Sequence, residues 1–260
     1  MIGRDRSDPG PEDDDARSTS RRADHRMTSP TRTFGRTWRR PGPWTLAAAA
    51  VFALALLVYL RTLLPGPSFG DWAEMQFVPY QLGIPHPTGY PLYILLGKLF
   101  SLIPIGSIAW RAEFLSAVAA AAAAGTAVLI AGRLGVRPVI ALAAGLALAL
   151  TGTLWLEATF SEMNSLHLLL IAALIHRALV WRAERRDRDL RIGALLGGLA
   201  LSNHLLAMTV VPIIVLFVAA DAWRRLAERP MLILQMLGLG LLGLTRGSTL
   251  TTSGRVASCG

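Results

Sequence analysis

Long runs of apolar residues, each with at most one charged residue, alternate with short polar connections along most of the chain. Residues 44–64, 112–132, 138–156 and 163–181 each form such a run. About 20 apolar residues in a helix span the hydrocarbon core of a bilayer, which is roughly 30 Å thick. Because lipid cannot satisfy open backbone groups, the runs are expected to be helices. The pattern predicts an all-α fold, a polytopic bundle of transmembrane helices.

Two further apolar stretches have lengths that allow more than one interpretation. Residues 92–104 are too short to cross a bilayer and include Lys98, which predicts a helix lying in the membrane interface. Alternatively, this stretch joins residues 105–110 as one span broken at Pro104. That alternative places Arg133 and Arg137 on the outer side, against the tendency of arginine to stay in the cytoplasm.

Residues 192–220 form the second ambiguous stretch. As one helix, they would place the arginines of residues 224–229 outside the cell. As two half-length arms that meet at residues 202–204, they return those arginines to the cytoplasm. Broken helices are tolerated where other helices surround them, so we favour the hairpin. Residues 231–244 then begin another span.

The net charge of +9 does not indicate nucleic-acid binding, because the arginines lie in the N-terminal arm and in short connections between apolar runs. That placement encodes orientation in a membrane. It predicts a multi-pass protein of the inner (cell) membrane with a cytoplasmic N-terminus. The hydrophobic fraction of 53% and the mean hydropathy of +0.45 agree with a membrane protein. Cys259 is the only cysteine, so no disulfide framework is expected.

Composition divides the chain into three parts. Residues 1–43 are rich in arginine, aspartate, serine and proline, which predicts a disordered cytoplasmic arm. Residues 44–244 contain the apolar runs and form the transmembrane domain. Residues 245–260 read TRGSTLTTSGRVASCG and resemble nothing before them. We expect this tail to be non-native or disordered, the product of a truncation or a shifted reading frame.

The loop of residues 65–91 is rich in proline, glycine and aromatic residues and carries the first candidate site residues. Loops of this length in a compact bundle are usually functional. Asp71 and Glu74 are three residues apart, so a helical turn would align their carboxylates. Alternatively, they only cap a helix start. His86 lies between two prolines, which would hold its imidazole and Tyr90 rigidly, or simply form a stiff surface turn.

The remaining candidates lie in later connections. Glu157 and Glu162 flank a short turn, and each alternatively complements a helix start. Asn203 and His204 lie deep in an apolar stretch, where polar groups need a partner, and a satisfied structural histidine is the alternative. Under the predicted topology all these acidic and histidine side chains point toward the outer half of the membrane. One acidic, histidine-containing face indicates a site.

Three segments of the chain resemble a known family. They are GDWAEMQFVPYQLGIPHPTGYPLYILLGKLFSLIPIGSIAWR, FSEMNSLHLLL and GLALSNHLL. They resemble a protein O-mannosyltransferase-like membrane family, domain of unknown function 2723. The resemblance runs from about residue 66 to residue 244. It stops where the family would continue into a proline- and tyrosine-rich segment and more helices, which supports the expectation of a fragment.

The resemblance implies a GT-C-like glycosyltransferase module that uses a polyprenyl-phosphate sugar, with mannose expected, and acts at the outer face by inverting transfer to a hydroxyl. Asp71 would be the general base, and Glu74 would orient the acceptor or assist. Glu162 and His204 would lie around the same pocket. Besides this, we assign Lys98 and Arg111 to the donor phosphate, or alternatively to the anchoring of an interfacial helix.

Two other interpretations stay open: a transporter or lipid-handling protein, and an inactive remnant of an enzyme. The break near Asn203 favours the transporter, because broken helices form transporter sites. No metal-ligand spacing stands out, so neither a metal site nor a cofactor is expected. The expected partners are membrane lipid, a lipid-linked sugar donor and a protein or glycan acceptor, but no nucleic acid.

Overall fold

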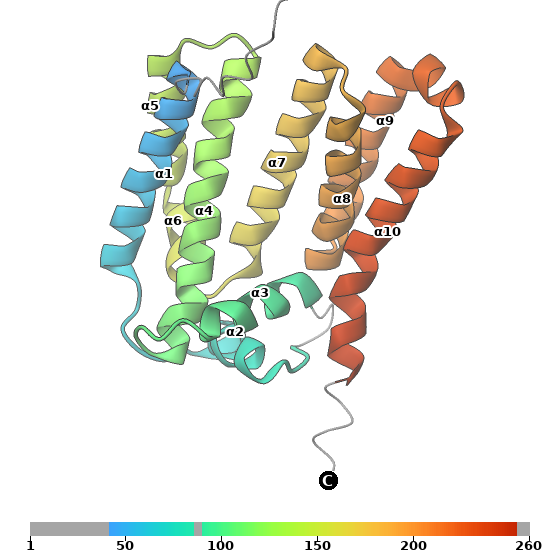
Figure 1. The fold of residues 1–260 in the computed structure, drawn as a ribbon. Helices are drawn as coiled ribbons and strands as arrows, with labels where there is room; N and C mark the ends of the chain where they lie inside the picture. Colours follow the sequence, from blue (N-terminus) through green and yellow to red (C-terminus); the bar gives the residue numbers. More distant parts are fainter. Residues whose placement is uncertain (1–41, 86–89, 254–260) are drawn as a thin grey trace, which may run out of the picture. The chain divides into compact units, whose positions relative to one another are not determined.

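The computed structural model describes residues 42–85 and 90–253, and every regular element in those ranges is an α-helix (Figure 1). The predicted site residue His86 lies outside the described residues. In chain order the helices are α1 (Pro43–Thr62), α2 (Gly70–Gln81), α3 (Pro91–Ser101), α4 (Ile108–Arg133), α5 (Pro138–Ala149), α6 (Gly152–Thr159), α7 (Met163–Glu184), α8 (Asp187–Asn203), α9 (Ala207–Ala227) and α10 (Pro230–Ser253).

Four of the described helices, α1, α4, α7 and α9, are each long and apolar enough to cross a membrane. A fifth span is counted when the bent pair α5 and α6 is taken as one. Helices α1, α4 and α7 occupy three of the four long apolar runs of the sequence. The prediction of an all-α, polytopic membrane protein is confirmed.

The predicted span of residues 138–156 is wrong as a single helix. Its two parts, α5 and α6, meet at an angle of 62°. Thr151 caps the start of α6, where its Oγ1 accepts a hydrogen bond from the Leu154 N–H at 3.4 Å. The hydroxyl of Tyr59 in α1 donates to the carbonyl oxygen of Ala149 at 2.7 Å. Side chains therefore serve backbone groups on both sides of the bend, which an apolar run does not reveal.

Helices α8 and α9 settle the ambiguous stretch of residues 192–220. Helix α8 ends at Asn203, and α9 begins at Ala207 after a connection of residues 204–206. The hairpin prediction is confirmed, and the single-helix alternative is wrong. The arms are longer than half a span, at 17 and 21 residues, because both continue into the charged flanks of the stretch.

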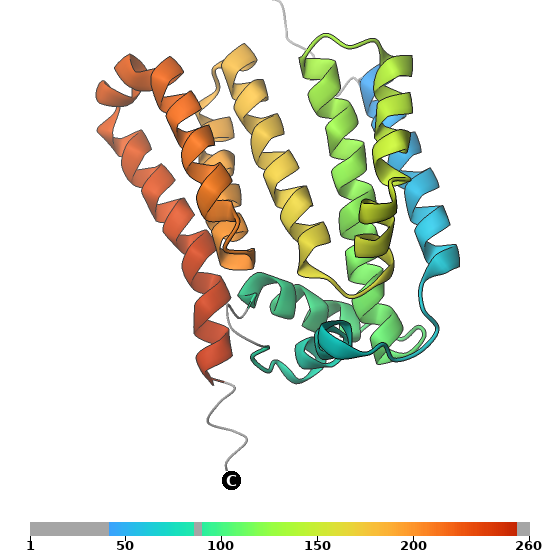
Figure 2. The same ribbon diagram turned by 180° about the vertical axis from the view of Figure 1, so that it is seen from behind.

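The short helix α3 is separate from the span that follows it. Helix α3 ends at Ser101, and Ser107 caps the start of α4 by accepting a hydrogen bond from Trp110 N at 3.1 Å. The alternative of one span broken at Pro104 is therefore wrong. Helices α2 and α3 lie across one end of the bundle (Figures 1 and 2). Helix α10 passes the predicted limit at residue 244 and continues to Ser253.

Connections alternate between the two ends of the bundle. Helices α2 and α3 share one end with the α6–α7 and α8–α9 connections, and we name this the α2–α3 end (Figure 1). The α4–α5, α7–α8 and α9–α10 connections lie at the opposite end, which we name the arginine end because these connections and the helix ends beside them are rich in arginine. Trp44 fixes the start of α1 at the arginine end, because its indole N–H donates to the Val136 carbonyl at 2.9 Å.

The alanine-rich helix α4 packs against α1, α5 and α7. Small side chains let the backbones approach closely, as is common between membrane helices. A Cβ at Gly125 of α4 would lie only 3.0 Å from the Ala48 carbonyl of α1. Glu113, near the start of α4, is a buried charged residue in this otherwise apolar packing, and it holds α2 through a hydrogen bond to Gln76.

Candidate functional site

Helix α2 carries the predicted pair of carboxylates at the α2–α3 end. Asp71 and Glu74 lie one turn apart in this helix, so the sequence spacing does align them on it. Asp71 occupies the first turn and is exposed, whereas Phe69 is the residue at the cap position. Trp72 packs its ring against Phe160, with centroids 4.2 Å apart. The start of α2 therefore lies against the α6–α7 connection.

A buried polar contact fixes α2 to the membrane helix α4. The Gln76 side chain donates from Nε2 to Oε1 of Glu113 at 2.6 Å, and its own Oε1 accepts the Ser68 N–H at 2.8 Å. Gln76 is 4% exposed and Glu113 is 0% exposed. Our sequence interpretation missed both residues. The signal was present for Glu113, because a carboxylate at the start of an apolar run of residues 112–132 needs a partner.

Glu162 lies in the α6–α7 connection beside α4. The backbone N–H of Glu162 donates to the Ser116 hydroxyl oxygen at 3.0 Å, and the same hydroxyl lies 3.1 Å from the backbone carbonyl oxygen of Glu162. The Tyr93 hydroxyl lies 3.2 Å from the same serine oxygen. Tyr93 is fully buried, and burial raises the pKa of its hydroxyl above the ordinary value of 10.0. Tyr93 therefore stays a neutral hydrogen-bonding group that links α3 to α4.

Glu157 lies in α6, just before this connection. Its backbone carbonyl accepts the hydroxyl of Ser165 at 2.6 Å, which ties α6 to the first turn of α7. The predicted turn of residues 157–162 is therefore shorter in the structure: Glu157 lies within α6, and Glu162 is the residue just before α7. Both residues belong to elements of the α2–α3 end.

An aromatic and imidazole cluster forms where α7 meets the α8–α9 connection. The His204 ring lies 5.6 Å from the Tyr90 ring and 5.1 Å from the His167 ring, measured between centroids. Nδ1 of His204 accepts the Leu206 N–H at 3.0 Å. Burial lowers the pKa of His204 below its ordinary value. The structure thus brings together two predicted residues and adds His167, which our sequence interpretation missed.

Asn203 has the partner that the sequence argument required. Its Nδ2 donates to the Met163 carbonyl at 3.2 Å, at the first residue of α7. The amide oxygen of Asn203 is buried and has no hydrogen bond among the described residues. The contact holds the α8–α9 connection against α7, which gives Asn203 a structural role.

The two predicted phosphate-binding cations contact backbone carbonyls. Lys98 donates from Nζ to the Tyr80 carbonyl at 2.6 Å and lies over the Tyr80 ring. The Arg111 guanidinium donates to the carbonyls of Ser101, Ile105 and Gly106, and so fastens the connection after α3. These contacts favour the alternative role that the sequence left open, the anchoring of a short helix.

The chemistry that this end offers is proton transfer and hydrogen bonding. Asp71, which is exposed, and its neighbour Glu74 carry carboxylates that can accept protons, and the imidazoles of His204 and His167 can take part in hydrogen bonds. No group of three or more histidine, cysteine or acidic residues that could hold a metal occurs in the described part of the chain. A separate cavity of about 500 Å³ lies among α7, α8, α9 and α10, and none of the site residues predicted from the sequence lines it.

Comparison with known proteins places the chain among membrane proteins of one family. Residues 71–227 match the profile of the "Protein O-mannosyl-transferase TMEM260 N-terminal domain". The chain is 32% identical over 213 residues to "Protein O-mannosyl-transferase TMEM260" of Mus musculus, which covers 77% of the chain and 29% of that relative.

A second relative is "Protein O-mannosyl-transferase tmem260" of Dictyostelium discoideum, 39% identical over 71 residues, which are 26% of the chain and 9% of the relative. The chain thus spans less than a third of the length of these relatives. No solved structure matches it. Because the matched profile covers more than half of the chain, from α2 to α9, the chain belongs to the TMEM260 N-terminal domain family.

Proposed function

We propose that the chain acts in the transfer of mannose from a polyprenyl-phosphate donor to a hydroxyl group of an acceptor, in the manner of GT-C glycosyltransferases. The names of the relatives support the sugar and the reaction class. The observation that carries the proposal is the position of Asp71. It is an exposed carboxylate on a helix that follows the first span directly and lies across one end of the bundle.

In the proposed reaction the acceptor hydroxyl attacks the anomeric carbon of mannose. Asp71 takes the hydroxyl proton as the new carbon–oxygen bond forms. The bond between the anomeric carbon and the phosphate oxygen breaks, and the phosphate leaves with the bonding electrons. Direct attack inverts the anomeric centre. Glu74, one turn away, orients the acceptor or assists the base.

The other residues of the α2–α3 end surround this helix in the proposal. Glu162 and His204 belong to the α6–α7 and α8–α9 connections, and Tyr90 contacts His204. Neutral imidazole can donate a hydrogen bond to a sugar hydroxyl without a proton transfer. These groups are therefore proposed to bind the sugar or the acceptor. Lys98 and Arg111 support the short helix α3, and a phosphate contact would add to that role.

The proposed orientation puts the α2–α3 end outside the inner membrane and the arginine end in the cytoplasm. The arginines of the α4–α5, α7–α8 and α9–α10 connections support it, because such residues are retained in the cytoplasm. A donor whose lipid is embedded in the outer leaflet would then reach Asp71 at the membrane surface.

The transporter alternative loses its main support in the structure. Residues 204–206 connect two antiparallel helices at the end of the bundle, whereas a transporter site uses a helix broken near the membrane midplane. We therefore do not pursue it.

The test is a transfer assay on the reconstituted chain with radiolabelled mannosyl polyprenyl phosphate and a serine- and threonine-containing peptide. Asp71→Asn keeps the shape of the side chain and removes its basicity, so we expect transfer to fall by about 10²- to 10⁴-fold. Asp187→Asn is the matched control, because Asp187 also lies in the first turn of a helix but at the arginine end. Unchanged transfer by Asp71→Asn would remove this residue from the mechanism.

A further inference from the structure

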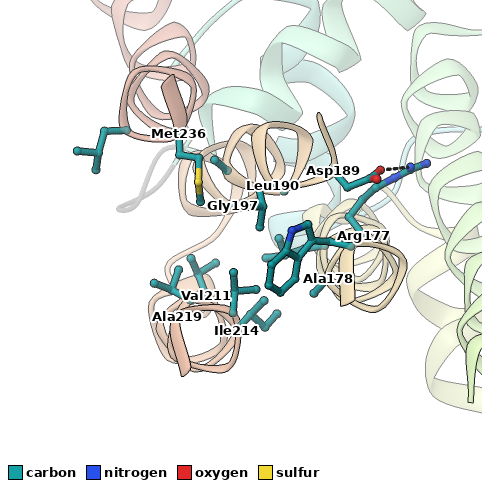
Figure 3. A pocket seen from close by; sticks show the side chains of 18 of the residues that line it. Arg177, Ala178, Asp189, Leu190, Gly197, Val211, Ile214, Ala219 and Met236 are labelled. Carbon is teal, nitrogen blue, oxygen red and sulfur yellow. Dashed lines mark hydrogen bonds and ion pairs between the residues drawn. The ribbon is translucent and has the colours of Figure 1, made fainter. Parts of the chain in front are cut away.

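A cavity of about 500 Å³ lies between α7, α8, α9 and α10, among residues that the proposed reaction does not use. Figure 3 shows side chains of these helices around one space, with Ala178 from α7, Leu190 from α8, Ile214 from α9 and Met236 from α10. The space is not closed off but opens to the surface of the bundle, where lipid surrounds a membrane protein. An apolar hollow of this size that faces a bilayer can take up a lipid chain.

Glycines of α8 create the space. A Cβ at Gly193 or Gly197 would meet only ordinary contacts, at 3.7 Å from Leu174 and 3.5 Å from Val211, so side chains there would have room. Gly198, by contrast, packs directly on the backbone of Gly240 and closes α8 against α10. The cavity is thus left between a tight α8–α10 contact and the more loosely packed helix α9, of whose apolar window only 17% is buried.

The lining chemistry selects an apolar occupant. Arg177 and Asp189 are the charged residues of the lining, and they bond to each other at 3.1 Å. The other lining residues are aliphatic residues, glycines, Met236 and Trp181. Water needs two to four polar partners to occupy a buried site, so an apolar cavity of this kind does not hold it well. A hydrocarbon chain from the surrounding bilayer meets the requirement.

The arginine end supplies an excess of positive charge beside the cavity. Four carboxylates there are each shared by two arginines: Asp187 by Arg225 and Arg229, Asp189 by Arg177 and Arg186, Asp221 by Arg182 and Arg185, and Glu184 by Arg133 and Arg186. Within these ion pairs, seven guanidinium groups face four carboxylates. Such an excess attracts anionic lipid headgroups.

Two of these arginines lie over aromatic rings, and one of the two rings lines the cavity. The Arg185 guanidinium lies 4.7 Å from the Trp181 ring centroid, and Trp181 lines the cavity. The Arg182 guanidinium lies 5.4 Å from the Phe217 ring centroid. Their side chains are 43% and 57% exposed, and both share Asp221, so one positive charge remains for an anion. Arginine donors suit a phosphate, which can accept two parallel hydrogen bonds.

We propose that this cavity binds one acyl chain of an anionic phospholipid, with the headgroup phosphate against Arg182 and Arg185. The lipid would come from the leaflet at the arginine end, opposite to the end that carries Asp71. The proposal therefore does not depend on the proposed transferase activity. The bound chain would fill the space behind α9 and fasten that helix to the bundle.

Native mass spectrometry of the purified chain in a mild detergent tests this site. The detergent micelles contain equimolar palmitoyl-oleoyl phosphatidylglycerol and palmitoyl-oleoyl phosphatidylcholine. We expect one phosphatidylglycerol to remain bound, in at least about fivefold preference to phosphatidylcholine. Equal retention of the two lipids, or retention of neither, would overturn the proposal. So would displacement of phosphatidylglycerol by stoichiometric polyprenyl phosphate, which would assign the cavity to the donor lipid.

Two variants with matched controls locate the bound lipid. Gly197→Leu fills the cavity and should abolish lipid retention, whereas Gly238→Leu, in open space on α10, should leave it unchanged. Arg182→Gln with Arg185→Gln should remove the preference for phosphatidylglycerol, whereas Arg137→Gln, exposed at the same end, should keep it. If Gly197→Leu and the double arginine variant both retain phosphatidylglycerol as the wild-type chain does, the assignment is contradicted. If a variant does not fold, the preference of the wild-type chain for phosphatidylglycerol over phosphatidylcholine still tests the proposal.

Discussion

Gln76 and Glu113 join the helix that carries Asp71 to a membrane helix through a 2.6 Å hydrogen bond between side chains that are 4% and 0% exposed. The remaining carboxylate oxygen of Glu113 is buried without a hydrogen bond among the described residues. Hydrogen bonds of this kind are strong where water is absent, and a buried group that loses its partner is costly. The contact therefore decides how firmly α2 is held.

Glu113→Ala should release α2, because it leaves the Gln76 amide buried without its acceptor, at a cost of about 1–3 kcal/mol. The measurement is the rate of maleimide labelling at Met75→Cys, a 1% exposed position on α2, with Cys259→Ser as the background. Labelling should become roughly 5- to 150-fold faster. Glu113→Gln retains an acceptor and should label nearly as slowly as the parent.

Two controls separate local release of α2 from general unfolding. Thr126→Ala lies on the same helix and removes only a bond to its own backbone, so labelling at residue 75 should not change. A cysteine reporter at Val51→Cys, a 0% exposed position of α1 in the core that it shares with α4, should stay slow in the Glu113→Ala background. Equal acceleration at both reporters would argue against a specific anchor.

Gly198→Ala should destabilise the packing of α8 on α10. A Cβ at this position would overlap the carbonyl oxygen of Gly240, which is backbone and cannot turn away. Overpacking of this kind costs about 1–3 kcal/mol, read as a lower midpoint of thermal unfolding in detergent. Gly238→Ala has open space and should be neutral or stabilising by about 0.5–1 kcal/mol, since alanine favours a helix. An unfolding midpoint equal to that of the wild type for Gly198→Ala would show that α8 and α10 can move apart without a loss of stability.

Acid should weaken the α8–α9 connection through His204. Burial lowers the pKa of His204 below its ordinary value of 6.5, so the folded chain binds fewer protons there than the unfolded chain. The stability that this histidine contributes is complete above pH 6.5 and declines as the pH falls toward the lower folded-state pKa. His204→Asn keeps an acceptor for Leu206 N–H but does not titrate. The unfolding midpoint of the variant should therefore fall less than that of the parent between pH 7.5 and pH 5.5, and parallel curves would contradict this cause.

Labelling from one side of the membrane should distinguish the two ends of the bundle. Ile105→Cys at the α2–α3 end and Leu134→Cys at the arginine end are 60% and 67% exposed positions, placed in a Cys259→Ser background. With an impermeant maleimide on intact spheroplasts, we expect Ile105→Cys to react and Leu134→Cys to react only after permeabilisation. The reverse result would invert the proposed orientation and place Asp71 in the cytoplasm.

Much of the fold was predictable because a bilayer makes strong demands on a sequence. Length and apolarity determined where α1, α4 and α7 lie, and the arginines of the connections determined which ends belong together. The carboxylates of Asp71 and Glu74 could be proposed as site candidates for the same reason, since charges next to a span are costly unless they are used. These inferences need only local sequence and the properties of lipid.

Contacts between distant segments decided the rest. The bend after Ala149 uses the hydroxyl of Tyr59, 90 residues away, and the anchor of α2 joins residues 37 apart. The pairing of His167 with His204 likewise needs α7 beside the α8–α9 connection. The sequence by itself determined which segments enter the membrane and on which side the charges gather. Only tertiary structure determined which buried polar groups meet and where a cavity remains, because both depend on how helices pack, and packing is not a property of any single segment.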